Sequence, residues 1–159
     1  MDIYSYAMKM EKDGEEFYRE LAGKTDDKGL KSILGMLADA EVRHYNILRN
    51  MKMNEGGKEF NTDALAYLKN IFETLKDSRQ FDLDGSAIEL YKKAQFIEIQ
   101  SREFYLDEAK TAAPPRRETF AKIADEEQRH YLILEDIITM VDKPRTWLET
   151  PEWYHLDEY

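Results

Sequence analysis

The stretch LADAEVRHYNIL, residues 37–48, decides the fold because it returns later in the chain as IADEEQRHYLIL, residues 123–134. Eight of the twelve letters are identical, and the two copies start 86 residues apart. Each copy belongs to a stripe of residues that recur at alternating spacings of three and four, which predicts a helix with one buried face. The stripes are Leu34, Leu37, Glu41, His44, Leu48 and Met51 in the first copy and Phe120, Ile123, Glu127, His130, Leu134 and Ile137 in the second. Shared amphipathicity gives no reason for identical Glu, Arg, His and Tyr residues. We therefore interpret the two stretches as an internal repeat.

A second pair of matching stretches lies upstream of the first pair. MEKDGEEFY at residues 10–18 corresponds to IEIQSREFY at residues 97–105, which lies 87 residues later. Each half of the chain is therefore predicted to be one helical hairpin. Four long helices with a long middle connection predict an all-α, antiparallel four-helix bundle.

Helix start and stop signals place the predicted elements along the chain. The four long helices are expected at about residues 3–22, 29–53, 86–112 and 114–141, with an S-x-x-E capping box at Ser86 and Glu89. Residues 61–75 show the pattern of a short one-faced helix inside the long connection. We expect one domain over residues 1–143, followed by an extended aromatic and acidic tail over residues 144–159 that is not an independent domain.

The composition excludes several classes of protein. The 159 residues carry a formal net charge of −10, which disfavours binding to nucleic acid or to an anionic membrane surface. There is no cysteine, so disulfides, zinc knuckles and iron–sulfur clusters are excluded for this chain. Neither a signal peptide nor a long uncharged apolar stretch is evident, and we expect a cytoplasmic protein.

Charged and imidazole side chains interrupt the apolar stripe of each long helix, which we call the seam. Six of them fall on the seams: Glu11, Glu41, His44, Glu98, Glu127 and His130. Four buried carboxylates without a counter-charge would each cost several kcal/mol. Two divalent metal ions would supply four positive charges, and both carboxylate and imidazole groups are suitable ligands. The spacing therefore predicts a dinuclear metal site held by these six residues.

The stretches MEKDGEEFY, ADAEVRHYNIL, IEIQSREFY and ADEEQRHYLIL, in this order and over nearly the whole chain, resemble the rubrerythrin branch of the ferritin-like di-iron carboxylate superfamily. The resemblance implies a ferritin-like bundle, two iron ions, and the same six ligands, with Glu11, Glu41, Glu98 and Glu127 as bridging carboxylates that shift during redox change. It also implies reduction of hydrogen peroxide or dioxygen in defence against oxidative stress. Since no cysteines are present for a C-terminal rubredoxin module, the electrons are expected from a separate rubredoxin-like or flavin donor.

Several alternatives remain open at this point. Manganese or a mixed metal pair suits the same ligands as iron. The chain could instead be a ferroxidase, an iron-handling or storage protein, or a metal-binding bundle without a catalytic role. Peroxidases of the family often carry an additional glutamate on the third helix, where this chain has Gln95 and Ser101. Glu15, one turn after Glu11, could substitute as the extra ligand.

Aromatic residues raise two further expectations. Tyr18 and Tyr105 each lie seven residues after a seam glutamate. The resemblance implies that they hydrogen-bond a ligand carboxylate or relay an electron, although packing with a satisfied hydroxyl is the more common role of a buried tyrosine. The tail contains Trp147 and Trp153, and exposed tryptophans usually find a partner surface. The tail could pack across its own bundle or across a second subunit, and we favour the second arrangement and expect a homodimer.

Overall fold

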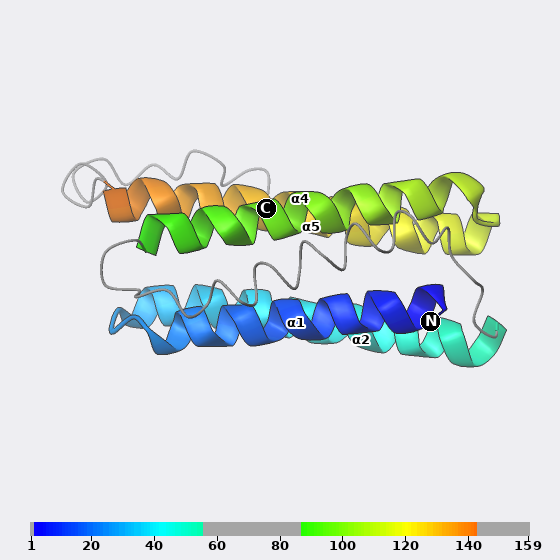
Figure 1. Cartoon of the computed structure of the whole chain (residues 1–159), viewed down its shortest axis with the longest axis horizontal. Coiled ribbons are helices and arrows are strands. Elements are labelled where there is room, and N and C mark those ends of the chain that lie inside the picture. Colours follow the sequence, from blue (N-terminus) through cyan, green and yellow to red (C-terminus); the bar gives the residue numbers. More distant parts are fainter. Residues whose placement is uncertain (1, 56–86, 143–159) are drawn as a thin grey trace. The chain divides into compact units, whose positions relative to one another are not determined.

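The computed structural model describes residues 2–55 and 87–142 (Figure 1). Its elements are α1 (Ile3–Gly23), α2 (Lys28–Glu55), α4 (Ala87–Thr111) and α5 (Pro114–Asp142). All four are α-helices, which confirms the predicted all-α class of a ferritin-like four-helix bundle. Their bounds lie within two residues of the sequence-based predictions.

The chain divides into two compact units, Met1–Phe81 and Asp82–Tyr159. In the first unit α1 packs along α2, and in the second unit α4 packs along α5 (Figure 1). Each unit therefore contains one helical hairpin, as the internal repeat predicted. We call them hairpin one (α1 and α2) and hairpin two (α4 and α5).

Three predicted features lie outside the described residues. These are the short helix at residues 61–75, Ser86 of the capping box, and the tail at residues 144–159. The proposed domain boundary and the tail-mediated dimer contact therefore stay predictions. Among the described residues, no helix is both long enough and apolar enough to cross a membrane.

Side-chain caps explain where the helices of hairpin one begin. The Asp2 carboxylate accepts hydrogen bonds from the Ser5 backbone N–H at 2.9 Å and from the Ser5 hydroxyl at 2.9 Å. Asp27 Oδ1 accepts a bond from the Leu30 backbone N–H at 2.9 Å, just before the first turn of α2. Each bond satisfies a backbone donor that has no partner within its helix. Lys52 Nζ, near the end of α2, lies 3.5 Å from Asp2 Oδ2 and connects the two helices there.

The seams form the core of each hairpin. The apolar seam residues that are at most 2% exposed are Leu34, Leu37 and Leu48 in α2 and Phe120, Ile123, Leu134 and Ile137 in α5. Each buried side chain of this size stabilises the fold by about 1.5–3 kcal/mol. Met8 in α1 and Met51 in α2 are only half-buried. In α2 and α5 these buried apolar residues thus lie before and after the charged and imidazole residues of the seam.

Candidate metal centre

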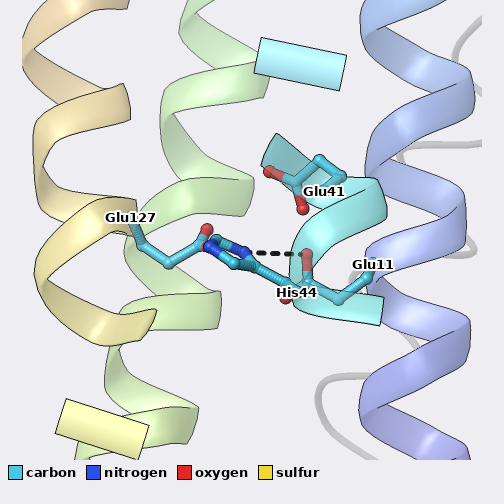
Figure 2. A group of neighbouring side chains, drawn as sticks. All are labelled: Glu11, Glu41, His44 and Glu127. Atoms are coloured by element: carbon cyan, nitrogen blue, oxygen red, sulfur yellow. Dashed lines mark hydrogen bonds and ion pairs between the residues drawn. The ribbon is translucent and has the colours of Figure 1, made fainter. Parts of the chain in front are cut away.

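Hairpin one brings three buried ligand groups together. Glu11 comes from the middle of α1, and Glu41 and His44 lie one turn apart on α2 (Figure 2). One ligand atom from each lies within 4.8 Å of the others, and none of the three side chains is more than 4% exposed. The three-residue spacing places Glu41 and His44 on the same face of α2, so that both reach the Glu11 carboxylate.

The closest contact in this group joins the two helices. His44 Nδ1 lies 3.3 Å from Glu11 Oε2, the interaction drawn as a dashed line in Figure 2. A carboxylate oxygen and an unprotonated imidazole nitrogen are both acceptors. They approach this closely only if the nitrogen carries a proton or if a cation lies against both atoms. In the tautomer that carries hydrogen on Nδ1, the imidazole donates this hydrogen to the Glu11 carboxylate, and a bound cation could take the place of the hydrogen between the same two atoms.

Hairpin two repeats the arrangement with the equivalent residues. Glu98 of α4 and the pair Glu127 and His130 of α5 each offer a ligand atom, and these atoms lie within 4.8 Å of one another. His130 Nδ1 lies 3.5 Å from Glu98 Oε1, which matches the contact between His44 and Glu11. Glu98 and Glu127 are each 1% exposed. The internal repeat thus extends from sequence to the paired Glu-Glu-His groups.

The composition of each group fits a divalent metal ion. Two carboxylates carry a charge of −2, which one divalent cation balances, and a neutral imidazole adds a third ligand. Burying two carboxylates without a cation would cost several kcal/mol for each carboxylate. This penalty is of the same order as the stabilisation gained by burying the apolar seam residues. The buried groups could therefore hold metal, and their donor atoms suit iron, manganese or zinc.

Glu15, considered above as an additional ligand, has a different partner. Its Oε2 accepts a hydrogen bond from Arg19 Nε at 2.8 Å. It does not contribute an atom to either group of potential ligands. The carboxylate is therefore engaged on α1 by an i,i+4 ion pair.

The two neighbours of Glu98 that stand where the family often has an additional glutamate are both buried. Gln95 donates from Nε2 to the Tyr131 backbone carbonyl at 3.2 Å and to Glu135 Oε2 at 2.7 Å. Its amide group thus connects α4 to α5. Ser101, 4% exposed, is the second neighbour. Neither residue supplies a seventh carboxylate.

The two tyrosines singled out by the sequence are buried, with Tyr18 at 3% and Tyr105 at 0% exposure. The Tyr105 ring stacks on Phe120, with centroids 6.1 Å apart and an interplanar angle of 25°. It also meets Phe104 edge-on at 5.2 Å. These contacts agree with the packing role for Tyr105, and the electron-relay role stays a prediction.

One close contact of the site was missed by the sequence analysis. A Cβ atom placed on Gly14 would lie 3.2 Å from Glu41 Oε2, so the carboxylate lies directly against the α1 backbone. A signal was available, because a glycine inside a helix is unfavourable and Gly14 aligns with Ser101 in the repeat. The periodicity that identified Glu11 and Glu41 carries no information about such a contact.

Comparison with known proteins addresses the family directly. No curated protein and no solved structure matches the chain. The sequence profile of the family described as Rubrerythrin does match, over residues 2–144. This range includes both hairpins and all six of the predicted ligands. The chain therefore belongs to the rubrerythrin family.

Proposed function

We propose that the protein is a di-iron oxidoreductase of rubrerythrin type that reduces hydrogen peroxide or dioxygen. The observation that carries the proposal is the presence of two buried Glu-Glu-His groups, one in each hairpin, at equivalent positions of the repeat. Two groups of three ligands suit two metal ions, and membership of the rubrerythrin family favours iron. Manganese suits the same donor atoms, so the test below includes both metals.

The roles of the residues follow from their chemistry. Glu11, Glu41, Glu98 and Glu127 would neutralise the ions, and His44 and His130 would each add a nitrogen ligand. Bound iron would supply one-electron ferrous–ferric changes, two of which provide the two electrons that, together with two protons from solvent, convert one hydrogen peroxide to two waters. Carboxylates can bind through one oxygen or two, which lets the glutamates adapt to a changing ion. The apolar seam residues limit the access of water to them.

The electrons are proposed to come from a separate rubredoxin-like or flavin protein. The chain has no cysteine, so none of its residues can hold a rubredoxin-type iron. We propose a homodimer as the assembly in which this reaction takes place.

A second function is supported by the neighbours of Glu98. Because Gln95 and Ser101 occupy the positions where an additional glutamate would favour peroxidase activity, the same six residues would also suit a ferroxidase that oxidises ferrous iron as its substrate. Such an iron-handling or storage protein would need a large shell, whereas peroxide reduction is compatible with a dimer. Sedimentation of the purified protein separates a dimer from a shell.

The test is anaerobic loading of the metal-free protein with ferrous iron, followed by metal analysis and then by a pulse of hydrogen peroxide monitored by absorbance. We expect about two iron ions per chain and oxidation by peroxide that is faster than oxidation by dissolved dioxygen. Parallel loading with manganese tests the choice of metal. Less than one metal ion per chain, with no absorbance change, would contradict the proposal and leave a bundle without a metal role.

Rapid oxidation by dioxygen, together with continued uptake of added ferrous iron beyond two ions per chain, would instead support the ferroxidase function. Turnover with a chemical reductant distinguishes the two cases further. A peroxidase consumes peroxide repeatedly at constant iron content, and a ferroxidase consumes iron.

A further inference from the structure

Gly14 lies in the middle of α1, three residues after Glu11, and it is buried. Glycine destabilises a helix interior relative to alanine because the unfolded chain loses more conformational freedom on folding. A glycine at this position is therefore unexpected unless a side chain would be obstructed. The three heavy atoms nearest to a Cβ placed there all belong to Glu41, namely Oε2 at 3.2 Å, Cδ at 3.4 Å and Cγ at 3.6 Å.

We propose that Gly14 is a positioning residue for Glu41, because its missing side chain leaves the space in which the Glu41 carboxylate lies when it binds metal. The inference rests on the proposed metal-binding function and adds to it a residue that binds no metal. Gly14 would act only through Glu41, by letting this ligand lie against the backbone of α1.

The distances indicate how large the effect should be. Ordinary contacts between non-bonded heavy atoms lie at about 3.5–4.0 Å, so a methyl group on residue 14 would displace Glu41 Oε2 by a few tenths of an ångström. Glu41 is 4% exposed, and its carboxylate therefore has little solvent-filled space into which to move. Distances from ligand to metal are defined to within about 0.2 Å, so a shift of this size matters for binding.

Hairpin two differs at the equivalent position. The repeat places Ser101 where hairpin one has Gly14, and Ser101 is buried at 4% exposure. Hairpin two thus carries a Cβ atom and a hydroxyl group where hairpin one carries neither.

The experiment compares Gly14→Ala with Gly35→Ala in cobalt titrations of the metal-free full-length protein, followed through the visible absorbance of bound Co²⁺. Gly35 is the matched control, because it lies inside α2 and a Cβ placed on it meets no atom within 4 Å. Both substitutions replace a helical glycine with alanine, which by itself favours the helix, so Gly35→Ala should keep or raise the melting temperature. In Gly14→Ala this gain is offset by the cost of moving the Glu41 side chain.

We expect wild type to bind about two cobalt ions per chain, and Gly35→Ala to bind each of them with the wild-type affinity. Gly14→Ala should bind one of the two ions about 10-fold to 100-fold more weakly, with a changed visible spectrum, as when partners of a metal ligand are altered. A Gly14→Ala titration and spectrum identical to those of Gly35→Ala would overturn the inference. Failure of wild type to bind cobalt would overturn the metal-binding function itself, so the two failures can be told apart.

A second pair of variants isolates the contact between residues 14 and 41. Glu41→Asp withdraws the carboxylate by one methylene group, so adding Gly14→Ala to Glu41→Asp should change cobalt affinity by less than about threefold. An equal loss in both backgrounds would overturn the inference. If Gly14→Ala alone does not fold, folding restored by Glu41→Asp supports the contact, and failure to fold in both backgrounds contradicts it.

Discussion

Hairpin one and hairpin two have the same potential ligands in different surroundings. In both, a glutamate of the first helix lies close to a histidine of the second, at 3.3 Å for Glu11 and His44 and at 3.5 Å for Glu98 and His130. In both, a second glutamate lies one turn before the histidine. The residues that carry charge and nitrogen ligands have thus been kept across the repeat, which is expected if two metal ions need equivalent ligands.

The neighbours of these ligands have diverged. Position 14 is glycine in hairpin one and its equivalent is Ser101 in hairpin two, while half-buried Met8 corresponds to the hydrogen-bonded Gln95. The six potential ligand positions have therefore changed less between the two halves than the residues packed around them. The two halves are therefore expected to respond differently when equivalent neighbours are exchanged.

The largest expected effect comes from removing one ligand in either hairpin. Glu41→Ala and Glu127→Ala should each lower the iron content from about two ions per chain to about one or fewer, and should lower peroxide reduction by at least about 100-fold. The helices should persist, because the seam leucines and Phe120 remain buried. Metal analysis, circular dichroism and peroxide turnover are the measurements.

Glu15→Ala serves as the control for these variants, because the Glu15 carboxylate pairs with Arg19. It should retain full iron loading. Full loading in both Glu41→Ala and Glu127→Ala would contradict the ligand assignment, and loss of iron in Glu15→Ala would show that this carboxylate is a ligand after all.

The next effect concerns equivalent core positions, Leu34 in α2 and Phe120 in α5. Leu34→Ala should lower the free energy of unfolding by about 2–5 kcal/mol and Phe120→Ala by about 3–5 kcal/mol, because both leave a buried cavity. Phe120→Ala also removes the ring on which Tyr105 stacks. Urea unfolding of the metal-free protein is the measurement, with exposed Lys122→Ala as a control within about 0.5 kcal/mol of wild type. Phe120→Ala should be the more destabilising of the two, and a larger loss of unfolding free energy in Leu34→Ala would contradict this expectation.

Exchange at Met8 and Gln95 tests the divergent neighbours. Gln95→Met copies hairpin one and removes the bonds to the Tyr131 carbonyl and to Glu135, which should lower the free energy of unfolding by about 1–3 kcal/mol. The reverse exchange, Met8→Gln, should cost less than about 1 kcal/mol because Met8 is half-buried. Denaturant unfolding of both variants measures the difference. Equal costs would indicate that the Gln95 bonds add nothing to the packing of α4 on α5.

The smallest effect concerns the start of each hairpin, where Asp2 corresponds to Glu89 in the first turn of α4. Partial burial alone would raise the pKa of the Asp2 carboxyl, but the hydrogen bonds from Ser5 and the charge of Lys52 outweigh it and lower the pKa. A lowered pKa means that this stabilisation is present above the unfolded pKa of 3.8 and is lost as the pH falls through the folded pKa.

Asp2→Ala should therefore lower the free energy of unfolding by about 1 kcal/mol at pH 7, with a smaller difference from wild type at pH 3. Asp2→Asn keeps a capping oxygen without a charge, so it should retain most of the stability at pH 7 and lose the pH dependence. Thermal unfolding at both values of pH is the measurement. If the stability difference between Asp2→Ala and wild type were the same at pH 3 and pH 7, this would contradict the role of the Asp2 charge.

Much of the fold could be predicted because helix signals and seam periodicity are local. Helix start and stop signals and the spacing of seam residues placed all four helices within two residues of their observed bounds. The structure then shows the side chains of Asp2 and Asp27 capping α1 and α2. The repeat then assigned the helices to two hairpins. The six buried charged and imidazole residues followed because each interrupts an apolar stripe at a helical spacing.

The contacts between helices could not be predicted in the same way. Periodicity gives the direction in which a side chain leaves its helix, but it does not give the side-chain rotamer or the distance to a neighbouring helix. The approach of His44 to Glu11, the bonds of Gln95 to α5 and the ion pair that occupies Glu15 therefore emerged only from the packed hairpins.

The amino-acid sequence alone was sufficient to identify an all-α protein built from two copies of a hairpin, each carrying two glutamates and one histidine on its seams. These properties depend on residue type and spacing, which are written in the chain. The tertiary structure decided which atoms meet, including the position of Glu41 against the backbone at Gly14. Such contacts depend on how closely two helices pack. A change of a few tenths of an ångström in the distance between the helices is enough to move a side chain out of the position in which it could bind a metal ion.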